Sequence, residues 1–318
     1  MTWTLRLKSP GEENKKCVFE DMIKGKIEMQ ENVQDIVLLK SDGIPTYHFA
    51  SVVDDHLMRT THVVRGDEWI ASCPIHIQLN KLLGFRVPKF VHVAPIMKTE
   101  GDGKRKLSKR KDPEAAVSYY SQEGYPAESV NEYMMTLANS NFEDWRRANK
   151  NEDIAKFPFN IKKMSVSGAL FDIAKLNDIS KNVISAMNCE KVYSLSYEWA
   201  KEYNKELASL YEQDVDRAKA ILNIDRENKK PRKDIAKWSD IPDYISYMFD
   251  ETFEPCYELC GNATAQLAVK TLEKYIDTVN LNDTKDEWFD RIKSICEPVA
   301  ARRMLRSTNK TRKALPAT

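Results

Sequence analysis

The stretch THVVRGDEWIASCPIHIQLNKLLGFRVPKFVHVAPIM, residues 61–97, holds two short apolar runs with a helix-like segment between them. The runs THVVRG and KFVHVAPIM are typical of buried strands. Apolar residues in the middle recur with the spacing of one helix face, and Gly84 marks the expected helix end. The residues of that face are Ile75, Leu79, Leu82 and Leu83. A strand, a helix and a strand with short links predict a parallel pair with a right-handed crossover.

A strongly basic stretch follows the second strand. KRKLSKRKD, residues 104–112, comes after Gly101 and Gly103, and Asp112 with Pro113 predicts the start of a helix. Ligands of open α/β sheets bind at the carboxyl ends of the strands, and helix N-termini favour anions. The setting therefore favours contact with phosphate, while a solvated turn or a targeting signal also fits the composition.

The flanking regions differ in their patterns. The first 60 residues are predicted to be rich in strands, and DIVLLKSDGIPTYHFASVV, residues 35–53, suggests a hairpin around Ser-Asp-Gly. From about Pro126 onward the apolar spacing predicts helices. The charged connector at 223–238 has a basic centre beside an aromatic residue, which suits RNA binding and a solvated linker about equally.

Composition restricts the class of protein. The 318 residues carry a formal net charge of +1, and no apolar stretch has the length of a membrane span. The six cysteines lack a dense pattern, which indicates reduced thiols and a cytoplasmic protein without a membrane role. Cys256 and Cys260 could share a helix face, but no histidine lies nearby, so core packing is favoured over a metal site.

All five histidines fall between residues 48 and 92, with Asp54 and Asp55 among them. A metal-dependent phosphohydrolase is therefore an alternative interpretation. The histidine spacings of 8, 6, 14 and 16 residues match no zinc or two-metal motif, so we predict no metal site.

Four stretches resemble one family. They are SDGIPTYHFASVVDDHLMRTTHVVRGDEWIASCPIHIQL at 41–79, KLSKR at 106–110, SGALFDIAKLN at 167–177 and AILNIDRENKKPRKDIAKWSDI at 220–241. Together they resemble the bacterial-type glutamate–tRNA ligases, which are class I aminoacyl-tRNA synthetases. KLSKR resembles the signature loop usually written Lys-Met-Ser-Lys-Ser, and the whole resemblance runs from about residue 5 to residue 299.

The resemblance implies an α/β fold followed by an all-α part. The α/β part would be the second half of a class I Rossmann-type nucleotide-binding fold, and the all-α part would contact the tRNA stem and anticodon. The implied segments are the end of an acceptor-binding insertion (1–35), the half catalytic domain (36–125), a stem-contact-like helical domain (126–190), a partial anticodon-binding region (191–299) and a basic, disordered or spurious tail (300–318).

The resemblance also implies a two-step reaction. Glutamate attacks the α-phosphate of ATP to form glutamyl-adenylate, and the tRNA then accepts the glutamyl group. Lys109 matches the lysine that neutralises the phosphates, Lys106 matches the first lysine of the motif, and Ser108 can donate a hydrogen bond. ATP, carried with Mg²⁺, would further meet Arg110, Glu68, Ile96 and Met97.

The resemblance also implies which residues of this chain recognise the substrates. Tyr47 and Arg65 match residues that contact the glutamate, and Ser51 stands where many members have asparagine. Asp67 and Trp69 fall near the adenosine and the pocket wall. The residues expected to contact tRNA are Lys230, Arg232 and Lys233. Helices after residue 190 favour glutamate over glutamine as the amino acid, because the glutamine-type relatives carry β-barrels there. Whether tRNA(Gln) is a substrate beside tRNA(Glu) is left open.

One family motif has no counterpart. No two histidines are three residues apart, so the His-Ile-Gly-His type of motif is not found. We therefore expect a central piece of a ligase that is inactive alone and needs a second chain to complete the catalytic fold. The alternative is a non-catalytic tRNA-binding module derived from such a ligase.

Overall fold

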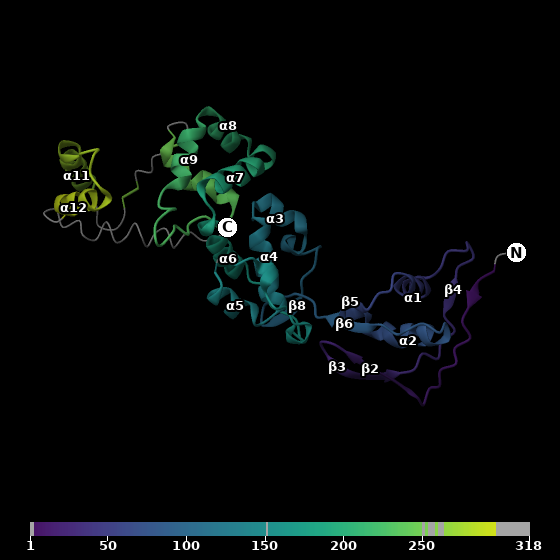
Figure 1. Cartoon of the computed structure of the whole chain (residues 1–318). Helices are drawn as coiled ribbons and strands as arrows, with labels where there is room; N and C mark the ends of the chain where they lie inside the picture. The colour runs from purple at the N-terminus through teal and green to yellow at the C-terminus, as the bar shows by residue number, and fades with distance from the viewer. Residues whose placement is uncertain (1–2, 151, 250–251, 254–257, 260–263, 297–318) are drawn as a thin grey trace. The chain divides into compact units, whose positions relative to one another are not determined.

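The computed structural model describes residues 3–150, 152–249, 252–253, 258–259 and 264–296 (Figure 1). The chain divides into two compact units, Met1–Met248 and Phe249–Thr318. This division lies inside the segment expected at 191–299, and the finer domain boundaries stay a prediction. Cys256, Cys260 and the tail at 300–318 lie outside the described residues.

A four-stranded sheet organises the first part of the larger unit, in the order β3-β2-β6-β5. The strands are β2 (Lys16–Asp21), β3 (Gly25–Gln30), β5 (His62–Gly66) and β6 (Lys89–Val93). β5 and β6 are parallel, from His62 opposite Lys89 to Gly66 opposite Val93. Helix α2 (Cys73–Leu82) connects them and ends before Gly84, whose φ of 69° suits glycine. The predicted strand–helix–strand unit is confirmed.

The hairpin predicted at 35–53 is wrong in its second arm. Strand β4 (Val37–Leu39) pairs with β1 (Leu5–Arg6), but the second apolar run forms helix α1 (Tyr47–Leu57). The two runs share one bridge, between Leu39 and Pro45, and a few hydrogen bonds beside it, such as the one from the N–H of Thr46 to the carbonyl of Leu38 at 2.8 Å. The apolar residues of the second run recur at helical spacing, and Val52 is buried where α1 packs beside α2.

The basic stretch is partly a strand. β7 (Met97–Glu100) and β8 (Gly103–Lys106) form an antiparallel hairpin with Gly101 at a φ of 58°. The helix predicted to start at Asp112 is a short 3-10 turn, Pro113–Ala115. The carboxylate of Asp112 does not cap that turn and accepts hydrogen bonds from the basic loop instead. Helix α3 (Val117–Glu123) begins only afterwards.

The hairpin is joined to the helical part through a short parallel contact. The N–H of Met97 donates to the carbonyl of Ala169 at 2.9 Å, and the N–H of Phe171 donates to the carbonyl of Met97 at 2.7 Å. Gly168 allows this approach because a Cβ there would lie 2.3 Å from the Pro95 carbonyl oxygen. The strands and the helices of this unit are thus connected through backbone hydrogen bonds.

Helices form the rest, as predicted. The larger unit adds α4 (Ala127–Ala138), α5 (Phe142–Ala148), α6 (Ile173–Ala186), α7 (Cys189–Tyr203), α8 (Lys205–Gln213), α9 (Val215–Asn223) and α10 (Ile241–Ile245). Its 3-10 turns are Asp67–Ser72, Pro113–Ala115, Ile154–Lys156, Ile161–Lys163, Trp238–Asp240 and Ser246–Met248. The smaller unit contains α11 (Ala265–Thr278) and α12 (Lys285–Cys296).

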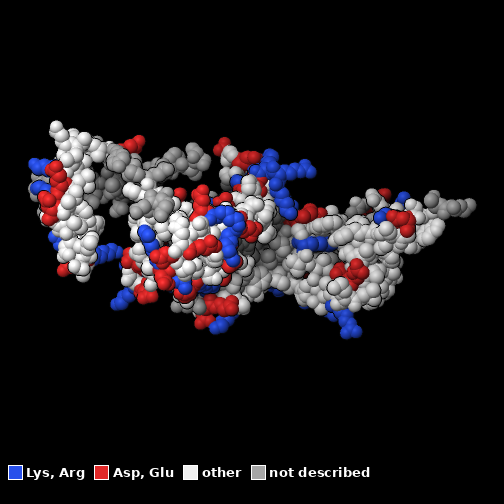
Figure 2. Space-filling model, turned by 90° about the horizontal axis from the view of Figure 1, so that it is seen from above, with Lys and Arg blue, Asp and Glu red and all other residues white. Residues whose placement is uncertain are grey.

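Two clusters of buried side chains stabilise the larger unit. The cluster beside the sheet contains Cys17, Cys73, Ile77 and Phe90. The cluster among the helices contains Tyr120, Tyr125, Tyr133, Phe171 and Leu176. Basic and acidic side chains are interspersed over much of the face in Figure 2, in keeping with the net charge of +1. Within the described residues, no helix is long and apolar enough to cross a membrane.

Candidate functional site

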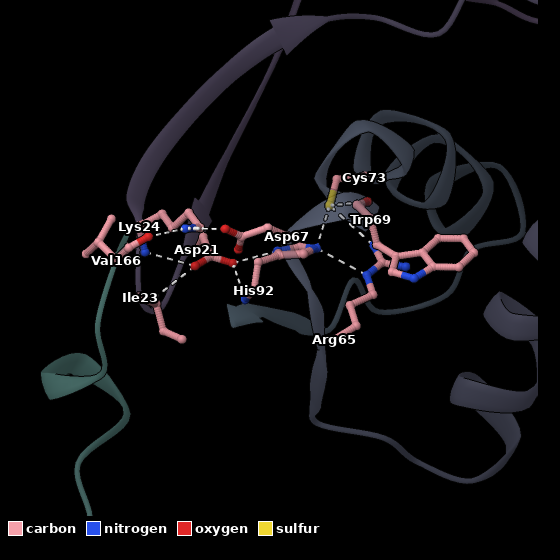
Figure 3. Close-up of polar contacts among 9 residues, drawn as sticks. All are labelled: Asp21, Ile23, Lys24, Arg65, Asp67, Trp69, Cys73, His92 and Val166. Carbon is pink, nitrogen blue, oxygen red and sulfur yellow. Dashed lines mark hydrogen bonds and ion pairs between the residues drawn. The ribbon is translucent and has the colours of Figure 1, made fainter. Parts of the chain in front are cut away.

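Arg65 lies near the carboxyl end of β5, with its guanidinium held by three neutral groups. Its Nε–H donates to Nε2 of His92 at 3.1 Å, Nη1 donates to Nδ1 of His76 at 3.2 Å, and Nη2 donates to Sγ of Cys73 at 3.3 Å. Figure 3 shows Arg65 with Cys73 and His92 at the end of the sheet. The partners come from α2 and β6, so the predicted strand–helix–strand unit brings them together.

The guanidinium has no acidic partner among the described residues, where it forms no ion pair. The rings of Trp69 and Phe90 lie 5.9 Å and 5.7 Å from its central carbon. An arginine held by neutral acceptors and aromatic rings keeps its positive charge available. This arrangement is suited to an anionic ligand such as a carboxylate.

His76 must be neutral to accept a hydrogen bond from Arg65. Burial, and after it the charge of Arg65, lower the pKa of His76 to about 3. Its other nitrogen lies 2.9 Å from Nδ1 of His48, whose pKa is lowered by burial and then by Arg65. Three of the five histidines, His92, His76 and, through His76, His48, therefore support an arginine. No group of three or more metal-ligating side chains occurs among the described residues.

Of the residues predicted to contact glutamate, Tyr47 lies near Arg65, with Trp69 beside both. The ring of Tyr47, at the start of α1, lies 4.6 Å from the ring of Trp69, centroid to centroid. Tyr47 is half exposed, so its outer edge is accessible. Ser51 lies one turn further along α1. The structure thus places Tyr47, Arg65 and Trp69 together at one end of the sheet.

A buried acid behind this group was missed by the sequence analysis. Asp21 ends β2, and its carboxylate accepts Nδ1–H and the backbone N–H of His92 at 2.8 Å and 3.0 Å. It also accepts the backbone N–H groups of Ile23 and Lys24, both at 2.9 Å. Burial acts to raise the pKa of Asp21, but the hydrogen bonds from Lys24, His92 and Ile23 bring it below its ordinary value. The Asp-x-x-x-Gly turn before Gly25 was the available signal.

The basic loop presents cations on its outer side. Lys109 and Arg110 are exposed and form no ion pair with any described residue. Nζ of Lys106 lies 3.7 Å from a carboxylate oxygen of Glu68, and both side chains are exposed. The structure therefore brings the loop next to Glu68, another residue predicted to meet ATP. Free cations on a turn are suited to phosphate groups.

The side chain of Asp112 anchors this loop. It is buried, and its carboxylate accepts two hydrogen bonds from Arg105, at 2.5 Å and 2.8 Å, and one from the N–H of Ser108 at 2.9 Å. Nζ of Lys98 lies 3.2 Å away. The hydrogen bonds from Arg105 lower the pKa of Asp112 most, burial opposes them, and Ser108 and Lys98 lower it further. Sequence analysis missed Arg105 and Lys98, because a helix N-cap was the simpler interpretation of Asp112.

Three of the backbone groups predicted to meet adenine already have protein partners. The carbonyl of Ile96 accepts the N–H of Leu107 at 2.8 Å, and both backbone groups of Met97 bond to residues 169–171. Ile96 also packs against the helical core. A contact between these groups and adenine would require the hydrogen bonds to be shared or broken.

The connector residues predicted to bind tRNA differ in availability. Lys230 is exposed and has no partner among the described residues. Arg232 pairs with Asp234 at 2.6 Å and lies over the ring of Tyr244. Nζ of Lys233 donates to the side-chain oxygen of Asn182 at 2.6 Å. Lys230 is thus the most available of the three.

Comparison with known proteins gives a consistent result. The catalytic-domain family of class I tRNA synthetases (E and Q) matches residues 1–178. The glutamate–tRNA ligase of Clostridium perfringens strain 13 is 49% identical over 298 residues, which is 92% of this chain and 55% of that protein. The ligase of Acetivibrio thermocellus is 48% identical over 294 residues, with 92% and 54% covered. The chain spans about half the length of these curated relatives.

Solved structures show the same likeness. A glutamate tRNA ligase from Elizabethkingia meningosepticum, crystallised in complex with its amino acid, superposes with a TM-score of 0.68 and 25% identity. That match covers 92% of this chain and 58% of the other. The predicted fold class, a Rossmann-type catalytic part followed by helices, is confirmed. The chain belongs to the class I tRNA synthetases of the E and Q family, and the relatives named above are glutamate–tRNA ligases.

Proposed function

We propose that this chain supplies part of the machinery that activates glutamate with ATP and transfers it to tRNA(Glu). The observation that carries the proposal is Arg65, an arginine without an acidic partner among the described residues, beside Tyr47 and Trp69. A guanidinium reads a carboxylate through paired hydrogen bonds. The substrate would be glutamate, and tRNA(Gln) is a second tRNA to be tested.

The chemistry assigns separate roles to the two ends of the site. In the first step an oxygen of the glutamate α-carboxylate attacks the α-phosphorus of ATP, and pyrophosphate leaves. Tyr47 and Arg65 orient the amino acid, while Lys109, Arg110 and Lys106 offset the charge that develops on the phosphates. In the second step a hydroxyl of the terminal adenosine of tRNA attacks the glutamyl carbonyl, and AMP leaves.

The exposed cations fit a triphosphate, and Mg²⁺ would arrive bound to it, adding positive charge at the phosphates. Ser108 contributes differently from the lysines. Its backbone N–H is bonded to Asp112, so its role in the folded loop is partly to hold the turn. Glu68 keeps Lys106 close to the site until phosphate competes for that cation.

We further propose that the chain does not complete this reaction alone. The histidine motif expected to meet ATP from the other side has no counterpart in the 318 residues. Protein synthesis would place the activity in the cytoplasm. The competing candidate is a module that only binds tRNA, favoured by the free cation of Lys230 on the connector.

Glutamylation of tRNA by the purified chain, with ATP, Mg²⁺ and labelled glutamate, tests both candidates. We expect no product and retention of tRNA on a filter, with affinity that falls as salt rises. Lys230→Ala should reduce, by about one, the steepness with which the logarithm of the tRNA affinity falls against the logarithm of the salt concentration. Loss of all tRNA binding would contradict the RNA role of both candidates.

Product formed by the wild-type chain would overturn the expected inactivity. In that case Lys109→Ala should reduce the rate by about a hundredfold or more, as does the loss of one group that stabilises developing charge. Lys104→Ala is the matched control, because Lys104 is an exposed cation in the same stretch outside KLSKR. Equal rates in the two variants would remove Lys109 from the mechanism.

A second chain is the partner we propose for the open edge of the sheet. Among the described residues β5 pairs only with β6, and Val64 on β5 is 61% exposed. An unpaired apolar edge favours addition of another strand. We expect the purified chain to associate in sedimentation experiments, and Val64→Lys to reduce that association. A monomeric wild-type chain at tens of micromolar, about the range where exposed edges aggregate, would contradict this.

A further inference from the structure

We infer that Asp21 and His92 act as a positioning pair that sets the orientation of Arg65 toward its anionic ligand. The identity of that ligand as glutamate rests on the proposed function. The pair itself is argued from the contacts in Figure 3, where Asp21, His92 and Arg65 form a continuous line of hydrogen bonds. The described residues thus connect an acid at the end of β2 with a cation near the end of β5.

The first step concerns Asp21, which accepts four N–H groups. One oxygen accepts the backbone N–H groups of Ile23 and Lys24, and the other accepts the backbone N–H and Nδ1–H of His92. An ionised carboxylate has acceptor capacity on both oxygens, whereas an amide has it on one. Asp21 is 1% exposed, so water cannot readily replace a missing acceptor.

The second step concerns the tautomer of His92. Because the carboxylate accepts at Nδ1, that nitrogen carries the hydrogen in the neutral ring, and Nε2 is left as an acceptor. Nε2 faces Nε–H of Arg65 at 3.1 Å, and an arginine can only donate. Asp21 therefore selects the one neutral tautomer of His92 that can hold Arg65.

The third step concerns the N–H groups and the positive charge that Arg65 keeps available for a ligand. Hydrogen bonds to His92, His76 and Cys73 engage three of the five N–H groups of Arg65. Two donors are left for a ligand, which is the number that a carboxylate accepts from an arginine fork. A direct ion pair with Asp21 would neutralise the guanidinium. With His92 between them, Arg65 is held in place and keeps its charge.

The test is nuclear magnetic resonance of the full chain with ¹⁵N-labelled histidine and arginine. In the wild type we expect His92 to carry its hydrogen on Nδ1. In Asp21→Asn, the amide NH₂ should turn toward His92, because on that side it opposes one backbone N–H, that of His92, whereas on the other side it would oppose two, those of Ile23 and Lys24. The imidazole can move its hydrogen to Nε2 and then accept from the amide at Nδ1. Nε2–H would then oppose Nε–H of Arg65, and hydrogen exchange at that Nε should accelerate about tenfold or more.

The controls separate this effect from general damage. Asp42→Asn is the matched substitution, because Asp42 accepts one backbone N–H, from Ile44, in an exposed loop. The resonances of His62, which contacts Thr61, should be unchanged in every variant. A wild-type His92 with hydrogen on Nε2 would overturn the inference, and this measurement needs no variant to fold. Unchanged tautomer and exchange in a folded Asp21→Asn would overturn it too.

Addition of glutamate distinguishes this inference from the proposed function. If the tautomer and exchange results are as expected but glutamate shifts no Arg65 resonance, the positioning pair stands and the glutamate assignment fails for this chain. If glutamate shifts the Arg65 resonances in the wild type and Asp42→Asn, it should bind at least about tenfold more weakly to Asp21→Asn, because a disordered guanidinium must be reordered on binding. Equal affinity would show that the pair has no positioning role.

Discussion

Between pH 6.5 and 4.5, the free energy of unfolding of the larger unit is expected to fall through His76 alone, with a slope that approaches about 1.4 kcal/mol per pH unit toward pH 4.5. The pKa of His76 is about 3 in the folded chain, and its ordinary value is 6.5. Below pH 6.5 the unfolded chain therefore takes up a proton that the folded chain cannot. Stability is complete above pH 6.5 and is lost as the pH falls toward 3.

Urea unfolding at several pH values between 6.5 and 4.5 measures this slope. His76→Asn should reduce the slope by more than half. Part of the slope should remain, because His48, whose pKa is also lowered, contributes in the same direction. His56→Asn is the matched control for the loss of a histidine, because His56 is exposed and stacks on Phe85, outside the group around Arg65. The lowered pKa values of Asp21 and Asp112 lower the stability progressively below about pH 5, so they add only at the acidic end of this window. A slope that His76→Asn leaves unchanged would contradict the prediction.

Replacement of Asp112 by alanine is expected to open the KLSKR loop to protease. The Ser108 N–H would lose its acceptor, Arg105 would lose Asp112 and keep Glu100, and Lys98 would lose an ion-pair partner. The exposed basic residues of 104–111 are natural trypsin sites once the turn opens. We expect limited trypsin digestion to cut this stretch about tenfold faster or more, because proteolysis follows the population of the opened form.

The control for this experiment is Asp102→Ala. Asp102 lies in the turn of the same hairpin, is exposed and has no partner among the described residues, so cleavage should stay at the wild-type rate. Mass spectrometry of the first fragments shows whether the cut lies within 104–111. Equal digestion of wild type and Asp112→Ala would mean that the loop conformation does not depend on this carboxylate.

Local patterns predicted much of this protein correctly. The strand–helix–strand unit at 61–97, the helix end at Gly84 and the helical remainder all depend on the spacing of apolar residues along the chain. The prediction for 35–53 failed in its second arm because a short apolar run does not by itself separate a strand from a helix. Asp112 was misassigned because a cap is a local interaction, whereas its partner Arg105 reaches it across a turn.

The sequence by itself determined the family of this chain and the elements that carry Tyr47, Arg65 and the KLSKR loop, because periodicity and motifs depend on neighbours in the chain. The tertiary structure alone decided what surrounds those residues. Asp21 and His92 are 71 residues apart, and only the folding of β2 beside β6 makes them partners. Protonation states and hydrogen-bond directions depend on burial and distance, and these are properties of the folded chain.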